Sequence, residues 1–175
     1  MSIIIRKVQI DDVYDYAITH INCWKDAYKG IISDEHISNM YAQLEERVER
    51  CRHSIENLDG FEYYCAINDD DMIGRLIFSK CRDEDKLDAG EIGAIYLIAE
   101  HWDKGYGKQM LEFALSELSK AGYEEIVIWV LEANKRARRF YEKHGFVQDG
   151  TTKKLEIDKK YIVVRYIRKT TTGDR

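Results

Sequence analysis

The sequence of 175 residues contains no proline. Its turns must therefore rest on glycine, asparagine and aspartate, which reach turn conformations by other means. It also has no apolar run of roughly 18 residues, the length that a membrane-spanning helix needs. The N-terminal segment MSIIIRKVQIDD lacks the apolar core and the small-residue cleavage site of a signal peptide. We therefore expect a cytoplasmic protein with no membrane partner.

The sequence also lacks closely spaced cysteine pairs, and it has no excess of positive charge. The four cysteines are scattered without a C-x-x-C pair, which argues against a structural zinc site and a disulfide framework. The five histidines are also scattered, and we interpret them as surface or core residues. The net charge of -5 argues against a nucleic-acid binder that relies on phosphate contacts. We expect neither a metal ion nor a nucleic acid as a partner.

The composition is that of a globular chain. Hydrophobic residues make up 45% of it and charged residues 34%, and its length suffices for one real core. No repeat, low-complexity stretch or linker divides it. We expect a single domain over residues 1–170 and a flexible tail over residues 171–175.

Hydrophobic periodicity predicts alternating strands and helices. The predicted strands cover residues 3–8, 61–67, 72–80, 91–98, 123–131, 146–148 and 154–167. The predicted helices run from Asp11 or Asp12 to about Tyr28, over a short segment capped by Ser33 or Asp34, and over residues 43–58, 107–121 and 134–144. The strand YEEIVIWVL is almost continuously apolar, as a strand covered on both faces would be. This order predicts an α/β protein with a mixed sheet and helices on both faces.

One loop, AEHWDKGYG, connects a predicted strand to a predicted helix and carries Gly105 and Gly107. Backbone N–H groups converge at a helix N-terminus, and the helix dipole favours negative charge there. The loop is neither a Walker motif nor a G-x-G-x-x-G fingerprint. It is therefore either an anion site or a turn that needs positive φ.

A second constellation lies in EANKRARRFYEKHGF. Asn134, Ala137, Arg138 and Tyr141 stand at i, i+3, i+4 and i+7, and they share one helical face. Both this helix and the one after the glycine loop follow strands, at the carboxyl ends where open α/β sheets bind ligands.

Together these residues resemble the GNAT superfamily of N-acetyltransferases. The segment NKRARRFYEKHGF matches the family's motif N-x-x-A-x-x-(F/L)-Y-(E/K)-K-x-G-F at every key position. The glycine loop matches (Q/R)-x-x-G-x-(G/A) with two departures: Trp102 replaces Gln or Arg, and Ala99 replaces a common proline. The resemblance covers roughly residues 3–169. It implies a mostly antiparallel sheet of about seven strands that opens in a V between strands 91–98 and 125–131.

The resemblance also implies a binding site for acetyl-CoA, the co-substrate. Its pyrophosphate would lie on the N–H groups from Lys104 to Lys108, and its pantetheine arm along the edge of the fourth strand. Asn134 would bind the arm, cap its helix, or do both. The lysines would add charge or be solvated. The implied donor-binding residues are Ile95, Tyr96, Leu97, Trp102, Lys104, Gly105, Tyr106, Gly107, Lys108, Asn134 and Ala137.

Two catalytic residues follow from the same resemblance. Tyr141 aligns with the tyrosine that protonates the leaving thiolate, although it could instead be a core aromatic. Glu91 is the candidate base, and strand alternation would put it on one face with Gly93, Ile95 and Leu97. The alternatives for Glu91 are an exposed carboxylate and deprotonation through waters.

Trp24 and Tyr28 are the candidate acceptor residues. The segment WKDAYKG is similar to the W-x-x-A-Y-x-G pattern of some bacterial small-molecule members, including polyamine acetyltransferases. Two aromatic rings would suit a cationic amine, and the alternative is that both belong to the core. We expect an N-acetyltransferase acting on a small primary amine, as a monomer or homodimer. A CoA-binding regulatory module, a protein N-terminal or lysine acetyltransferase, and an interaction protein on this fold remain alternatives.

Overall fold

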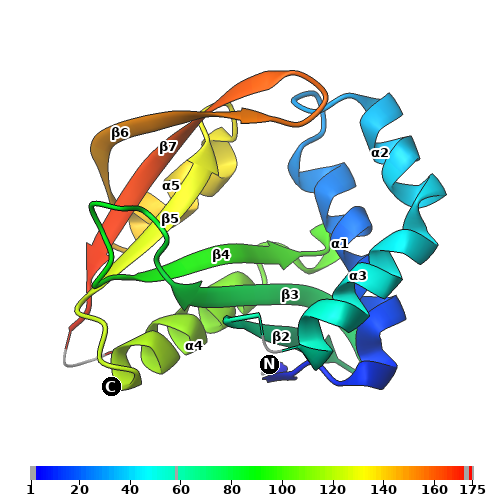
Figure 1. Ribbon diagram of the computed structural model, residues 1–175, viewed down its shortest axis with the longest axis horizontal. Coiled ribbons are helices and arrows are strands. Elements are labelled where there is room, and N and C mark those ends of the chain that lie inside the picture. Colours follow the sequence, from blue (N-terminus) through cyan, green and yellow to red (C-terminus); the bar gives the residue numbers. More distant parts are fainter. Residues whose placement is uncertain (1–2, 58, 172–173, 175) are drawn as a thin grey trace.

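The computed structural model describes residues 3–57, 59–171 and 174. Within them, seven strands form one sheet in the order β1-β2-β3-β4-β5-β7-β6 (Figure 1). The strands are β1 (Ile4–Lys7), β2 (Phe61–Asn68), β3 (Asp71–Lys80), β4 (Gly90–Leu97), β5 (Glu125–Leu131), β6 (Val147–Glu156) and β7 (Lys160–Lys169). Every neighbouring pair is antiparallel except β4 and β5. The predicted mixed, mostly antiparallel sheet is confirmed.

Helices cover both faces of this sheet, also as predicted. They are α1 (Val13–Ala27), α2 (Asp34–Ala42), α3 (Leu44–Glu56), α4 (Tyr106–Lys120) and α5 (Lys135–Lys143), with short 3-10 turns η1 (Ile10–Asp12) and η2 (Ala99–His101). Leu76 of β3 packs in one core with Leu111 of α4 and Tyr141 of α5. Cys65 of β2 faces the opposite way and packs with Tyr16 of α1. Each face of the sheet thus has its own apolar core.

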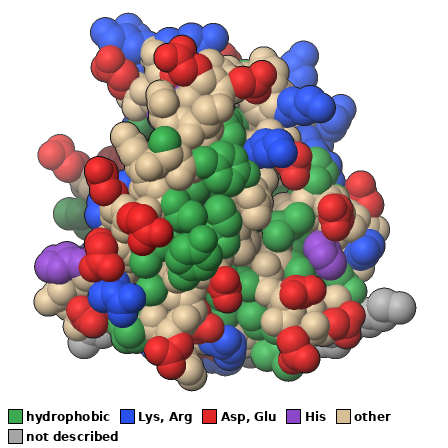
Figure 2. All heavy atoms as spheres, turned by 90° about the vertical axis from the view of Figure 1, so that its right-hand side faces the viewer, with side chains coloured by type: hydrophobic (Ala, Val, Ile, Leu, Met, Phe, Trp, Pro, Cys, Tyr) green, Lys and Arg blue, Asp and Glu red, His purple; other side chains and the backbone are tan. Residues whose placement is uncertain are grey.

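Figure 2 shows the side of the molecule on which α1, α2 and α3 lie. Hydrophobic side chains gather there in a central stripe, and acidic side chains surround it. No helix in the described part of the chain is long and apolar enough to cross a membrane.

Local capping chemistry was predicted correctly for α2 but not for α1. Asp12 precedes α1 and makes no side-chain cap hydrogen bond, because its carboxylate accepts hydrogen bonds from the Arg6 guanidinium at 2.6 and 2.9 Å. The Ser33 side chain accepts a hydrogen bond from the backbone of His36 and caps α2. The third helix ends at Glu56, and Leu58, its predicted end, lies outside the described residues.

The division of the last two strands was predicted wrongly. The segment 154–167 is not one strand, because it holds the end of β6, a turn and most of β7. The turn is closed by the Ile157 N–H, which donates to the Lys159 carbonyl at 3.0 Å. The turn contains no glycine, and β6 is an exposed edge strand without apolar alternation, so neither is recognisable from residue pattern alone.

The C-terminal end is held in part. Asp174 pairs with Arg168 at 3.0 Å and accepts the Thr171 N–H at 2.7 Å. Residues 172, 173 and 175 of the predicted tail lie outside the described residues.

The feature that positions the site is the divergence of β4 from β5. The two strands pair only where Gly90–Ile92 meets Ile126–Ile128. Beyond this short ladder they separate, and the V opens between them (Figure 1). The expected opening is therefore present, and it exposes the edge of β4 from Gly93 onward.

A bulge in β4 overturns the predicted alternation. Ile92 pairs with Phe78 and Ala94 pairs with Ile77, so Gly93 is an extra residue without a partner. After the bulge each side chain points to the face opposite to the one that simple alternation predicts. Glu91 therefore does not share a face with Ile95 and Leu97, as predicted. It lies on the face that carries Tyr96.

Candidate active site

A cleft of about 820 Å³ occupies the opening between β4 and β5. Its walls come from the exposed edge of β4, the facing part of β5, the start of α4, one side of α5 and the end of α1. Segments separated by a hundred residues thus meet around one space.

The β4 wall presents free backbone. The Ile98 N–H donates to the Ile73 carbonyl of β3. Because backbone groups alternate along a strand, the N–H and C=O of Leu97 point the other way, into the cleft. The indole Nε1 of Trp102 confirms this by donating to the Leu97 carbonyl at 2.7 Å. By the same alternation the backbone N–H and C=O of Ile95 face the cleft. Ile95, Tyr96 and Leu97 all line it.

The α4 wall is the N-terminal turn of a helix. Gly105 is its N-cap residue with φ of 84°, a left-handed conformation that glycine adopts without strain. The first backbone N–H groups of α4 have no partner inside the helix, and the helix dipole makes this end positive. The turn with positive φ is therefore present, and it places at the cleft a helix end whose charge suits an anion.

The two glycines do different things. Gly107 has ordinary helical geometry, and a Cβ there would meet the ring of Phe140 at 3.6 Å. Gly107 and Phe140 both line the cleft, so the absence of a side chain at Gly107 keeps the space between α4 and α5 open. Lys108 lines the cleft as well, while Lys104 is exposed outside it. The Tyr106 side chain is buried in the core and donates to Asn68 at 3.2 Å, so only its backbone is placed to bind.

The α5 wall carries the residues of the second motif. Asn134 is buried and caps the helix, because its Oδ1 accepts the Ala137 N–H at 3.1 Å. Asn134, Ala137 and Tyr141 line the cleft. Arg138, which the helical spacing placed with them, turns away and donates to Tyr166 at 3.0 Å.

Tyr141 combines burial with access to the cleft. Only 7% of the residue is exposed, and its ring packs edge-on against Phe140 and Phe146. Burial raises the pKa of Tyr141 well above its ordinary value, and Tyr96 adds to the shift. The hydroxyl therefore keeps its proton across the physiological range.

The α1 wall is aromatic. The hydroxyls of Tyr28 and Tyr96 lie 2.8 Å apart, and both residues line the cleft. Trp24 does not line it. Its ring packs 5.0 Å from Tyr28 and 6.3 Å from Tyr96, centroid to centroid, so it lies behind this pair. His20 packs against Trp24 and Tyr96, and burial together with Arg75 and Arg47 lowers its pKa well below 6.5.

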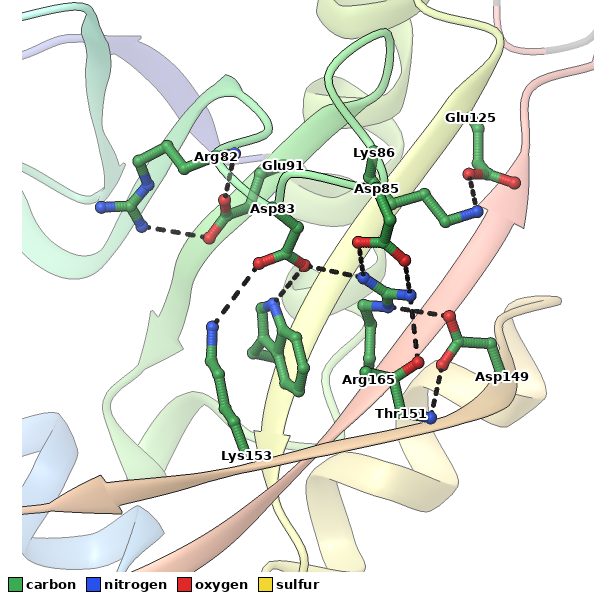
Figure 3. A network of polar contacts seen from close by, with 11 residues as sticks. Arg82, Asp83, Asp85, Lys86, Glu91, Glu125, Asp149, Thr151, Lys153 and Arg165 are labelled. Atoms are coloured by element: carbon green, nitrogen blue, oxygen red, sulfur yellow. Dashed lines mark hydrogen bonds and ion pairs between the residues drawn. The ribbon is translucent and has the colours of Figure 1, made fainter.

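Glu91 is buried and ion-paired rather than exposed to the cleft. Only 5% of it is accessible, and Arg82 donates to it from the guanidinium at 3.2 Å and from the backbone N–H at 3.4 Å (Figure 3). The register pairs it with Val127 of β5, so it shares a face with Trp129 two residues further on. That face also carries Tyr96, and the bulge therefore puts Glu91 on the side of the aromatic wall.

A polar network fixes the loop between β3 and β4 on this face. Asp83 accepts the Trp129 indole N–H at 2.9 Å and an Arg165 N–H at 3.1 Å (Figure 3). Arg165 is 3% exposed and also pairs with Asp85 and Asp149. The network holds Trp129, a residue of the β5 wall, in a fixed position.

Several cleft residues were not predicted. Trp129, Arg136 and Phe140 line the cleft, and none of the three was chosen from the sequence. For Arg136 and Phe140 the signal was available in part, since both lie within the second motif. Trp129 lay in an apolar strand whose faces the sequence does not distinguish. The described residues contain no group of three His, Cys, Asp or Glu side chains that could hold a metal ion.

Comparisons with known proteins agree with this geometry. Residues 24–146 match the Acetyltransferase (GNAT) family. The spermidine N(1)-acetyltransferase of Thermoplasma acidophilum is 30% identical over 169 residues, which cover 92% of this chain and 99% of that protein. The uncharacterised N-acetyltransferase YuaI of Bacillus subtilis is 25% identical over 131 residues, 74% of this chain and 72% of that one.

A solved structure shows the same arrangement of elements. The PaiA N-acetyltransferase of Thermoplasma acidophilum, crystallised in complex with coenzyme A, is similar with a TM-score of 0.74 at 27% identity. The similarity covers 97% of this chain and 99% of that one. The family match spans well over half of the chain and includes both motifs. The chain therefore belongs to the GNAT family of acetyl-CoA-dependent N-acetyltransferases.

Proposed function

We propose that this protein transfers the acetyl group of acetyl-CoA directly to a primary amine of a small molecule, with a polyamine as the candidate acceptor. The observation that carries the proposal is the position of Tyr141. Tyr141 lines the cleft together with the free edge of β4 and the first turn of α4, and its hydroxyl stays protonated. An acyl transfer to an amine needs a proton donor for the leaving thiolate at such a place.

The cleft fits the donor by parts. The first N–H groups of α4 and the side chain of Lys108 would hold the pyrophosphate. The peptide groups of Ile95 and the N–H of Leu97 would pair with the amide groups of the pantetheine arm, as an added strand pairs with a sheet edge. Oδ1 of Asn134 is taken by the helix cap, so its Nδ2 remains to donate to the arm. Acetyl-CoA supplies the activated thioester.

In the proposed reaction the amine nitrogen attacks the thioester carbonyl carbon. The C–N bond forms, the C–S bond breaks, and CoA leaves as a thiolate. Tyr141 donates its proton to the sulfur. Before the attack the ammonium form of the acceptor gives one proton to a base, and the second proton, which the nitrogen loses as the amide forms, restores Tyr141. The aromatic face with Glu91 is the side on which the acceptor would enter.

Glu91 is proposed as that base, acting through water. Its carboxylate lies beneath Arg82 rather than at the cleft surface. Direct contact with the acceptor is therefore not its role in this structure, whereas a short water chain past Tyr96 and Ala94 would link it to the amine.

The acceptor is proposed to bind at the wall formed by Tyr28, Tyr96 and Trp129. The rings of Tyr28 and Tyr96 offer π faces that attract a cationic amine, whereas the Trp129 ring already has Lys153 Nζ 3.8 Å from its centroid. The 30% identical spermidine acetyltransferase supports a polyamine as the acceptor class.

An acceptor screen tests the proposal. Release of free thiol from acetyl-CoA would be measured with polyamines, aminoglycosides, amino acids, and peptides with a free N-terminus or lysine. We expect turnover with spermidine or a related polyamine. Tight CoA binding without turnover on any acceptor would instead support a regulatory module, and turnover confined to peptides would support a protein acetyltransferase.

A further inference from the structure

Trp102 connects the two halves of the open sheet. It precedes α4, and its indole N–H donates to the Leu97 carbonyl at the end of β4. Its ring lies under the guanidinium of Arg136 from α5, with 3.6 Å between the guanidinium carbon and the ring centroid. One side chain thus contacts the β4 edge on one side and a cation of the opposite wall on the other.

Arg136 faces the part of the cleft where phosphate groups would lie. Arg136, Trp102 and Lys108 all line the cleft, and the start of α4 lies beside them. Arg136 also pairs with Asp103 at 3.4 Å, but half of its side chain and nearly all of that of Asp103 are exposed. An exposed pair of this kind contributes little, so the guanidinium would exchange it for a phosphate at small cost. The planar group keeps its stacking contact while its N–H edge turns to the anion.

We propose that Trp102 is a positioning residue for the donor and that Arg136, stacked on it, is a specificity residue for the phosphate groups of CoA. The inference rests on the proposed use of this cleft for acetyl-CoA. Trp102 acts at two points. It occupies the Leu97 carbonyl, which leaves the Leu97 N–H and the Ile95 peptide groups as the free pairing groups of β4. It also holds Arg136 beside the residues that precede α4 before the ligand arrives.

The replacement of Gln or Arg by Trp at this position explains why the cation comes from elsewhere. A polar side chain at position 102 would bind a phosphate itself. An indole cannot, but it fixes the guanidinium of α5 through its ring and the strand edge through its N–H. The α5 wall and the β4 wall are then coupled through one residue across the opening.

The test measures binding of CoA and of 3′-dephospho-CoA by titration calorimetry, without acceptor or turnover. Trp102→Phe keeps a ring and loses the N–H, and we expect Kd for CoA to rise a few-fold. Trp102→Leu loses both, and Arg136→Gln loses the cation; each should raise Kd on the order of tenfold. The double variant should be little worse than the worse single variant, because Trp102→Leu already removes the ring that holds Arg136 in place.

Two further comparisons make the test specific. Lys135→Gln removes an exposed positive charge next to Arg136 that does not line the cleft, and it should leave Kd nearly unchanged. If the Arg136→Gln effect disappears with 3′-dephospho-CoA, Arg136 binds the 3′-phosphate, and if it persists, Arg136 binds the pyrophosphate; either result supports the inference. Additive losses in the double variant, or an unchanged Kd in a folded Trp102→Leu variant, would overturn it. Failure of wild-type protein to bind CoA would instead reject the proposed function.

Discussion

The phenolic oxygens of Tyr28 and Tyr96 lie 2.8 Å apart, and this contact joins the end of α1 to the open part of β4. Burial raises the pKa of each hydroxyl above its ordinary value. Both therefore stay protonated, and one donates to the other. The pair fixes the aromatic wall at the place where α1 and the bulged strand meet.

Tyr28→Phe should raise KM for the acceptor amine several-fold and leave KM for acetyl-CoA nearly unchanged. The change leaves the buried Tyr96 hydroxyl without its partner, which loosens the wall on the acceptor side. Steady-state kinetics with each substrate varied in turn would measure it. Tyr41→Phe is the matched control, since that hydroxyl donates to Asn22 outside the cleft. Equal effects of both variants would place Tyr28 outside the acceptor site.

Tyr141→Phe should lower kcat by about 10²–10⁴-fold with little change in KM for acetyl-CoA, the pattern of a general acid. The pKa of Tyr141 is raised by burial, and the acid is active while protonated. Deprotonation of Tyr141 should therefore not lower the kcat of the wild type until the pH exceeds the ordinary tyrosine pKa of about 10. If the Tyr141→Phe variant keeps a kcat equal to that of the wild type at every pH, water or the amine delivers the proton instead.

Glu91→Gln should reduce kcat at neutral pH by roughly 10²-fold if the buried carboxylate receives the amine proton. The loss should shrink as the pH rises, because free amine then forms without a base. Glu125→Gln is a suitable control: Glu125 pairs with Lys86 at 2.6 Å, away from the cleft. Unchanged kcat in a stably folded Glu91→Gln variant would leave deprotonation to water alone.

Gly107→Val should weaken acetyl-CoA binding on the order of tenfold or more, because a branched side chain would fill the space between α4 and Phe140. Gly107→Ala should be tolerated, since its Cβ would meet Phe140 at an ordinary contact distance of 3.6 Å. Calorimetric titration of both variants separates steric closure from any general effect on α4. Equal binding by the valine variant would remove the donor site from this loop.

Arg165→Met should destabilise the protein by about 3 kcal/mol, because it leaves the largely buried carboxylates of Asp83 and Asp149 without the Arg165 guanidinium. The hydrogen bond from Arg165 lowers the pKa of Asp85, and it also helps to lower the pKa of Asp149. A lowered folded pKa contributes stability above the unfolded value of about 4, and that stability is lost as the pH falls through the folded pKa. Urea unfolding of the variant should therefore depend less on pH below about 4 than that of the wild type; an identical pH dependence would contradict the assignment.

Much of the fold was accessible from local patterns. The helix caps at Ser33 and Asn134, the left-handed turn at Gly105 and the face shared by Asn134 and Tyr141 depend on residues within one or two helical turns. Such features are set by nearby backbone chemistry, so spacing alone identified them. The family motif added the opening between β4 and β5, which no local pattern contains.

The tertiary structure decided what depends on distant partners. The bulge at Gly93 moved Glu91 to the aromatic face, and it exists only through the register with β3. Trp24 was placed behind Tyr28, and Trp102 beneath Arg136, by the packing of segments far apart in the chain. A sequence records which residues have chemistry to offer, whereas register and packing between distant segments determine which of them face the same space.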